Sequence, residues 1–363
     1  ILVGLIRISL RNEWSNIKFN SIDKIMIYYV IIRTITFTIL WSNSSAFIYM
    51  LGQNLDIFGG YFFIRVAIHD FKDYDTIIKT IVLMSIPVAI FMLYEQYSGG
   101  YNVFSLLGGV PEMSDVRQGK LRAQGAFSHS IMAGTFGATV LPLSWGLWHR
   151  KSRIIPIFGV GTSLVITWAS SSSGPIMTLF FCFFGIFLWS FRKHTKTLRN
   201  SFFLLIVVLH IVMKAPVWSL ISRIDLVGGS TGYFRYRLID AAIKNFFGWC
   251  ILGIKSTGVW GWGLVDVTNQ YILEGVRGGI IPLILFIIII VKCYKTIGTS
   301  RVIIENKLDL QKYVWSLGVV LFAYTFTFLS VSFFGAMIFF YFLLIAMISS
   351  LNNLSVFIID KES

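Results

Sequence analysis

The chain contains few charged residues and only three cysteines. Charged residues make up 13% of its 363 residues, about half of the share found in ordinary soluble domains. This composition excludes a soluble globular protein of the usual kind. The three cysteines are widely separated and show neither paired nor metal-ligand spacing, so we expect neither a disulfide framework nor a zinc site; they are Cys182, Cys250 and Cys293.

Sequence motifs for nucleotides, dinucleotides and metal ions are also missing. The chain has no GxxxxGK[ST] loop and no dinucleotide fingerprint in the required context. It holds 17 acidic residues against 31 basic ones, and the carboxylates predicted to lie outside the membrane do not form a recognisable ligand motif. We therefore expect no cofactor and no metal ion.

Apolar and aromatic residues dominate instead. The chain is 56% hydrophobic and contains 33 Phe, 15 Tyr and 11 Trp. Apolar runs recur at roughly the 17 to 25 residues that a membrane-spanning helix needs, and the alternating pattern of a membrane barrel is absent. The sequence predicts an all-α, polytopic transmembrane helical bundle that forms one integral membrane domain over residues 1–363. A truncated helix is expected at residues 1–10, followed by ten spans at residues 25–41, 46–68, 76–95, 130–148, 154–171, 174–191, 201–216, 271–292, 314–331 and 333–351.

The distribution of basic residues predicts the orientation of this bundle. If Lys24 lies in the cytoplasm, most basic residues fall in cytoplasmic segments, as the positive-inside rule requires. The bias is strongest in two short connections, "HRKSR" and "FRKHTKTLR". Because the charge is dispersed over several connectors, a nucleic-acid partner is a poor alternative. Membrane lipids are the expected surroundings.

Two connections predicted to lie outside the membrane are long, residues 96–129 and 217–270, and unusually basic for external segments. Long loops of mixed composition often carry function. The first loop contains a cluster of cations followed by a histidine at the next helix entrance: Arg117, Lys120, Arg122 and His129.

This first cluster has two interpretations. Arginine can bind phosphate oxygens in a bidentate manner while lysine acts as a point charge, so a phosphate-bearing lipid head group would fit. Alternatively, the cations snorkel beside lipid head groups at the interface and His129 is a polar helix cap.

The second loop predicts an amphipathic helix near the outer surface. Apolar residues have helical spacing between Tyr233 and Phe247, with Ser230 or Thr231 as the candidate cap. Asp240 and Lys244 form an i,i+4 pair whose role is structural. Two further cations of this helix, Arg235 and Arg237, lie on the side that has fewer basic residues, which suggests an anion shared with the first loop.

The end of the second loop, "GVWGWGLVDVTNQYILEGVRGG", combines glycines, tryptophans and polar residues. Trp260 and Trp262 offer amphipathic faces for a sugar or lipid, or else belong to an interfacial aromatic belt. The polar residues that enter the next span usually face a cavity or a partner, because acidic groups are costly there. They are Asp266, Thr268, Asn269, Tyr271 and Glu274, with Arg277 as an i,i+3 partner for Glu274.

These stretches resemble the O-antigen ligase and polymerase superfamily, bacterial membrane glycosyltransferases that act on lipid-linked glycans outside the inner membrane. "RAQGAFSHS" is similar to the family's Arg, Gly, Phe, His pattern and "SSSSGP" to its serine-rich helix break. "RYRLIDAAIKNFFGWCILGIKSTG" and "DVTNQYILEGVRGGIIPLILF" are similar to its external arginine helix and to the block that enters the next span. The resemblance covers roughly residues 70–286.

The resemblance implies a GT-C-like fold and a glycan donor on undecaprenyl diphosphate, with a glycan or lipid as acceptor. Arg122 and Arg235 would hold the diphosphate, with Arg237 assisting. Asp266 or His129 would serve the acceptor hydroxyl. Arg117, Lys120, Trp260, Trp262, Thr268, Asn269 and Tyr271 would bind substrate.

One departure from the family concerns the acceptor base. Ligases of this family usually have a His immediately before the Asn of the last block, where this chain has Thr268. Asp266 is the nearest replacement base, which favours a polymerase or exopolysaccharide-type transferase over a ligase proper. A lipid-linked glycan transporter or flippase and a noncatalytic scaffold remain the competing classes.

Overall fold

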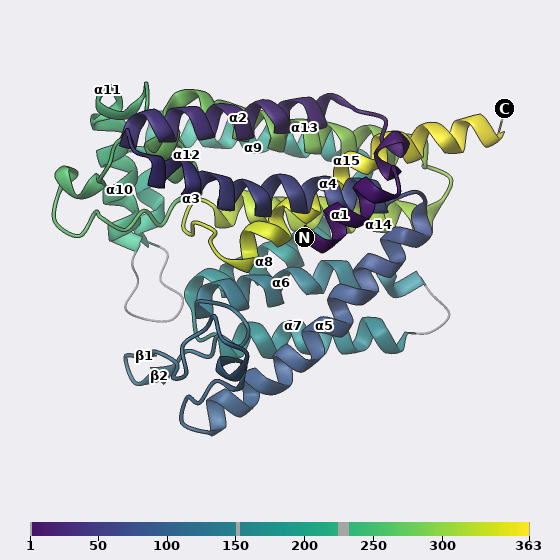
Figure 1. Cartoon of the computed structure of the whole chain (residues 1–363), viewed down its shortest axis with the longest axis horizontal. Coiled ribbons are helices and arrows are strands. Elements are labelled where there is room, and N and C mark those ends of the chain that lie inside the picture. The colour runs from purple at the N-terminus through teal and green to yellow at the C-terminus, as the bar shows by residue number, and fades with distance from the viewer. Residues whose placement is uncertain (1, 150–152, 224–231, 363) are drawn as a thin grey trace.

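A computed structural model describes residues 2–149, 153–223 and 232–362. These residues are 77% helical and have almost no strands (Figure 1), which confirms the predicted all-α class. Strand pairing within the described residues is confined to a hairpin of β1 (Val116–Arg117) and β2 (Lys120–Leu121) and to one isolated bridge. The α-helices are α1 (Leu2–Leu10), α2 (Ser21–Trp41), α3 (Ser44–Asn54), α4 (Gly60–Ala67), α5 (Phe71–Tyr97), α6 (Ser130–Gly146), α7 (Ile154–Ala169), α8 (Ser173–Phe187), α9 (Thr195–Val212), α10 (Gly232–Lys244), α11 (Phe246–Trp249), α12 (Gln270–Gly278), α13 (Ile280–Ile303), α14 (Leu308–Thr327) and α15 (Ala336–Glu362).

Several of these helices can cross a membrane by length and composition. Among the described residues, four stretches meet that criterion: Ser21–Trp41, Phe71–Tyr97, Ser173–Val212 and Ile280–Ile303. Ile154–Ala169 and Ala336–Asn352 are apolar but shorter. The protein therefore has helices suited to a membrane, while ten spans remain a prediction.

The predicted span at residues 271–292 starts too early, because the helix that is long and apolar enough to cross a membrane here is α13, which begins at Ile280. Two helices, α12 and α13, meet there at Gly279, whose φ of +83° is left-handed. A β-carbon at this position would overlap the carbonyl group of Ile251 in the second outer loop. The apolar period continues through the break, which is why the pattern alone suggested one helix. By contrast, residues 46–68 follow the expected course through α3, a π-helical turn η2 (Leu55–Gly59) and α4.

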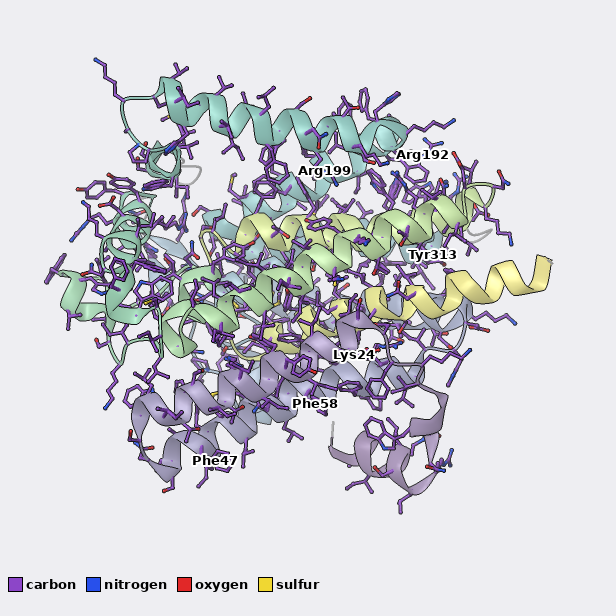
Figure 2. All side chains as sticks on the ribbon, turned by 90° about the horizontal axis from the view of Figure 1, so that it is seen from above. Lys24, Phe47, Phe58, Arg192, Arg199 and Tyr313 are labelled. Atoms are coloured by element: carbon purple, nitrogen blue, oxygen red, sulfur yellow. The ribbon has the colours of Figure 1, made fainter. Side chains whose placement is uncertain are left out.

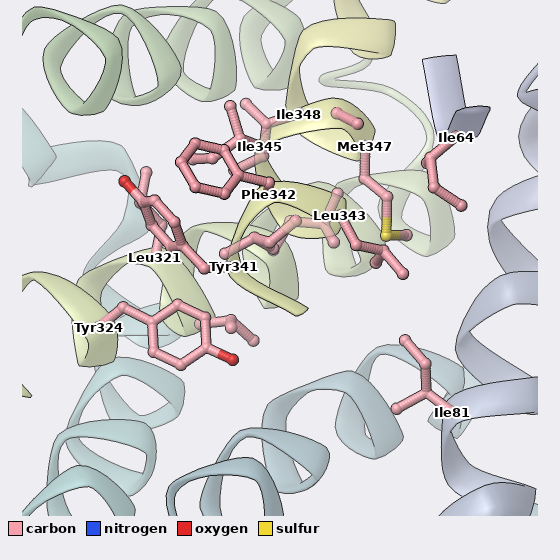
Figure 3. Packing of buried hydrophobic residues seen from close by; sticks show 14 of the residues in the cluster. Ile64, Ile81, Leu321, Tyr324, Tyr341, Phe342, Leu343, Ile345, Met347 and Ile348 are labelled. Atoms are coloured by element: carbon pink, nitrogen blue, oxygen red, sulfur yellow. The ribbon is translucent and has the colours of Figure 1, made fainter. Parts of the chain in front are cut away.

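The core is centred on α6, which is buried around almost its whole circumference and packs against α5, α7, α8 and α14. Small residues permit this close packing. A β-carbon on Gly134 would overlap the Ser170 hydroxyl and the Pro175 ring, so Gly134 brings the start of α6 against the break between α7 and α8. On the other side of α6, α14 and α15 contribute Tyr324 and Tyr341, whose ring centroids lie 6.0 Å apart (Figure 3).

A second buried contact ties α2 to α4 and α15. The Asp23 carboxylate, fully buried, accepts hydrogen bonds from Tyr61 Oη at 2.6 Å and Arg65 Nε at 2.9 Å. Arg65 also donates from Nη1 to Ser350 Oγ at 2.9 Å. Every charge here has a partner, as a buried ion pair requires.

The molecule has two distinct ends. Figure 2 shows Arg192 and Tyr313 toward one end and Phe47 toward the other. The hairpin β1–β2 and the helices α10 and α11 lie at the end opposite the C-terminus (Figure 1). The two loops predicted to be external therefore share one end of the bundle.

Candidate functional site

The guanidinium group of Arg122 is held inside the protein by a serine. Arg122 is 7% exposed and donates to Ser172 Oγ from Nε at 3.2 Å and from Nη2 at 2.8 Å. Among the described residues no hydrogen-bond acceptor contacts its Nη1 atom. Burial, together with the nearby charge of Arg117, lowers the pKa of Arg122 from its ordinary value, although an arginine stays protonated in proteins.

Ser172 belongs to the serine-rich break between α7 and α8. Ser171 adopts a left-handed φ of +43°, and the Ser172 hydroxyl donates to the Ser170 carbonyl at 2.8 Å. Ser130, the first residue of α6, lies 3.4 Å from Ser172 through its own hydroxyl. The break therefore turns the Ser172 oxygen toward Arg122 instead of continuing a helix.

Two residues at the end of α5 fix the loop that carries Arg122. The Glu95 carboxylate is fully buried and accepts the backbone N–H groups of Gln124 and Gly125, each at 2.9 Å, as well as the Ser114 hydroxyl. Gln96 donates through Nε2 to the carbonyl of Leu121 at 3.0 Å. The role of Glu95 is not readable from the sequence, because nothing in its spacing reveals that backbone donors 29 and 30 residues away converge on it.

His129 is the N-cap of α6. This confirms the part of the second interpretation of the first cluster in which His129 is a polar helix cap. Its Nδ1 accepts the N–H of Ile131 at 3.1 Å. Burial and then the charge of Arg122 lower the pKa of His129, while Asp115 and Asp266 oppose that shift. A neutral imidazole that accepts at Nδ1 carries its proton on Nε2.

The predicted amphipathic helix in the second loop is confirmed as α10. Leu238 and Ala242 form its buried face, and Lys244 Nζ lies 2.7 Å from Asp240 Oδ2 as predicted. Lys244 is fully exposed; the hydrogen bond and the charge of Asp240 raise its pKa. The predicted caps, Ser230 and Thr231, lie outside the described residues.

Arg235 and Arg237 of α10 have different surroundings. The Nε atom of Arg235 is buried and has no hydrogen-bond partner among the residues that the structure describes. Burial and then the charge of Arg117 lower the pKa of Arg235. Arg237 Nη2 lies 3.2 Å from where a β-carbon would stand on Gly261, so that glycine leaves room for the guanidinium group.

Basic side chains from the two outer loops therefore lie close enough to interact electrostatically. Arg117 lies within electrostatic range of both Arg122 and Arg235, and Arg122 lies within range of His129. Asp266 from the end of the second loop acts on His129 as well. Arg117 and Lys120 are exposed on the hairpin, whose turn residue Gln118 has a φ of +53°.

The remaining predicted site residues divide into exposed and internal groups. Trp262 is 91% exposed, Asp266 is exposed, and Trp260 is half-buried. Thr268 has a buried hydroxyl that finds no hydrogen-bond partner among the described residues. Trp260, Trp262 and Asp266 therefore lie where a ligand at the protein surface could reach them, whereas the Thr268 hydroxyl does not.

Asn269 and Tyr271 are engaged inside the protein. Asn269 caps α12 by accepting the N–H of Ile272 at 3.0 Å and donates to the Leu329 carbonyl at 3.0 Å. Tyr271 donates from its hydroxyl to the Thr325 carbonyl at 2.9 Å. A substrate contact through either residue would have to replace one of these bonds.

The expected i,i+3 ion pair between Glu274 and Arg277 is not formed. Glu274 instead faces α2, where Arg33 Nε lies 3.6 Å from Glu274 Oε2. Tyr29 Oη donates to the same oxygen at 2.9 Å. The preference has a physical reason, because Arg33 and Tyr29 are buried beside Glu274 whereas Arg277 is partly exposed.

Comparison with known proteins adds no assignment: no protein-family model and no curated protein sequence matches the chain. The resemblance to the O-antigen ligase and polymerase superfamily thus depends on the four sequence blocks alone.

Proposed function

We propose that this protein is a membrane glycosyltransferase that polymerises or transfers a glycan carried on undecaprenyl diphosphate at the external face of the bacterial inner membrane. The observation that supports the proposal is the convergence on Arg117 of Arg122 from the first outer loop and Arg235 from the second. Like charges repel, so the two pairs that Arg117 forms, one with Arg122 and one with Arg235, are stable only where solvent or an anion compensates them.

The chemistry of such a donor fits this cluster. Transfer breaks the bond between the sugar and the diphosphate, and the diphosphate leaves as an anion. Fixed positive groups that stabilise developing negative charge lower the barrier to this step. Arg122 is the best-fixed candidate, because Ser172 orients its guanidinium group. Arg235 has a buried N–H that finds no acceptor among the described residues, and Arg237, two residues further along α10, would assist.

The acceptor hydroxyl loses its proton in the same reaction. His129 is poorly suited to receive it, because its Nδ1 is occupied by the N–H of Ile131 and its neutral form carries a proton on Nε2. Asp266 is an exposed carboxylate within electrostatic range of His129. We therefore assign Asp266 as the base, which needs only to lie within hydrogen-bond reach of the acceptor.

The exposed tryptophans complete the proposed site. Trp262 and the half-buried Trp260 offer flat apolar faces on which a sugar ring can stack. Lys120 on the hairpin adds an exposed positive charge at the same end of the molecule. The proposal includes a GT-C-like arrangement of ten spans with this end outside the membrane.

Polymerisation is favoured over the ligase reaction by Thr268. This residue stands where ligases of the resembled superfamily usually have a His, and its buried hydroxyl cannot act as a base at neutral pH. The neighbouring Asp266 would then serve a glycan acceptor. Transfer to a lipid-linked glycan and transfer to a lipid A-type acceptor, measured in the same assay, would identify the acceptor class.

The experiment that tests the proposal is incubation of the purified protein, in detergent or vesicles, with a lipid-linked oligosaccharide. An elongated or transferred glycan supports the enzyme. Movement of the intact lipid between leaflets without transfer would instead support a flippase. If the protein neither transfers the glycan nor moves the lipid, the result would support a noncatalytic scaffold.

A further inference from the structure

A second group of charged side chains lies inside the bundle, where α2 meets α12. Arg33 is 4% exposed and Glu274 is 3% exposed. Glu274 accepts hydrogen bonds from Tyr29 Oη at 2.9 Å and from Gln270 Nε2 at 2.8 Å. Two neutral donors therefore already satisfy the Glu274 carboxylate without a hydrogen bond from an arginine.

The arginines beside this carboxylate are not satisfied. Arg33 Nε lies 3.6 Å from Glu274 Oε2, an ion-pair distance too long for a hydrogen bond. Its Nε and Nη1 atoms are buried and have no hydrogen-bond partner within the described part of the chain. Arg277 lies within electrostatic range of both Arg33 and Glu274, and among the described residues it forms no ion pair. Two guanidinium groups thus share one carboxylate.

A small cavity separates these groups. Arg33, Arg277, Glu274 and Gln270 line it together with aromatic residues of α13 and α15, and its volume is about 20 Å³. That exceeds the roughly 10–15 Å³ that a single water molecule needs, so the cavity has room for one water molecule or one monatomic ion. The π-helical turn η2 contributes Ile57 to the wall, and π-helical turns are frequent at functional sites.

We propose that Arg33 and Arg277 bind one small monovalent anion of the chloride class in this cavity. A single anion would accept from the unpaired N–H groups of Arg33 and compensate the second positive charge in apolar surroundings. A water molecule could accept from these N–H groups but could not compensate the positive charge. A phosphate or diphosphate group is too large for the cavity, so this site is distinct from the arginine cluster of the outer loops.

Thermal unfolding of the whole purified protein tests the site without any transfer assay. In chloride, the unfolding temperature should rise saturably above its value in gluconate at the same ionic strength, because a ligand that binds only the folded state stabilises it. Arg277→Gln should abolish this chloride-specific rise. Lys255→Gln, which removes an exposed cation that stacks on Trp41 at 5.8 Å, is the matched control and should keep it.

Bromide soaking of crystals locates the anion directly. An anomalous peak between Arg33 and Arg277 is the expected result, and the peak should disappear in Arg277→Gln. Equal unfolding temperatures in chloride and gluconate, or bromide bound only elsewhere, would mean that the cavity holds water, and would overturn the proposal. Arg277 is partly exposed, so its variant should fold even if changes at Arg33 do not.

Discussion

Arg122 donates two hydrogen bonds to the hydroxyl of Ser172, 50 residues further along the chain. The contact joins the first outer loop to the break between α7 and α8. A guanidinium group fixed in this way is oriented before substrate arrives, which is the condition under which a charge contributes most to transition-state stabilisation.

Arg122→Ala should reduce glycan transfer by about 100-fold or more, because the loss of one preorganised donor has that order of effect. Arg122→Lys should recover part of the activity, since lysine keeps the charge without the fork geometry. The measurement is the initial rate with a lipid-linked oligosaccharide. Arg199→Ala, at an exposed arginine on α9, is the control and should behave as wild type; unchanged transfer in Arg122→Ala would remove Arg122 from the site.

Glu95→Gln should loosen the loop that carries Arg122. The new amide group would place an N–H against one of the backbone donors of Gln124 and Gly125. Leaving such a buried donor unsatisfied costs about 1 to 3 kcal/mol. Amide hydrogen exchange at residues 122–127 should become faster, whereas Glu112→Gln, at an exposed residue, should leave it unchanged. Equal exchange in the two variants would show that Glu95 does not hold the loop.

Acidification should destabilise the start of α6 through His129. Because the folded state lowers the pKa of His129, the unfolded state binds the proton more tightly. Stability is therefore retained above the ordinary pKa of about 6.5 and is lost as the pH falls below that value toward the folded pKa. Protonation of Nδ1 also removes the acceptor for Ile131.

The variant His129→Asn tests this pH dependence. Asparagine can cap the helix through its side-chain oxygen but does not titrate, so the drop in unfolding temperature between pH 7 and pH 5 should be smaller than in wild type. An equal drop in both proteins would assign the acid sensitivity to another group.

Asp266→Asn should lower the transfer rate by about 100-fold or more, because a positioned general base contributes at least that much. His129→Asn should retain most of the activity at pH 7.5, since the histidine is a cap in our assignment. The two rates should be measured in the same membrane preparation. A severe loss in His129→Asn together with a normal rate in Asp266→Asn would exchange their roles.

Local features of the structure were predictable from sequence, and long-range partners were not. The periodicity of α10 and the i,i+4 spacing of Asp240 and Lys244 describe neighbours on one helix, and both are confirmed. Ser172 as the partner of Arg122, and Arg33 as the partner of Glu274, depend on how distant helices pack. No residue spacing encodes these contacts.

The breaks in the backbone were only partly predictable from the sequence. Adjacent glycines such as Gly278 and Gly279 are typical of a turn, but the apolar residues on both sides led to the prediction of one continuous span. The hairpin turn at Gln118 and Gly119 has two left-handed residues, and its strands are too short for their alternation to be recognised. An anion shared by the two loops was inferred from charge alone and stays a prediction; in the structure Arg117 lies within electrostatic range of both Arg122 and Arg235.

The most direct test of the account is a double-mutant cycle on Arg122 and Arg235, measured as the affinity for undecaprenyl diphosphate. If both guanidinium groups hold the same diphosphate, the loss of binding free energy in the double variant should differ from the sum of the single losses by about 0.5 kcal/mol or more. Additive losses, or undiminished affinity in the single variants, would contradict the claim that the two arginines share one ligand.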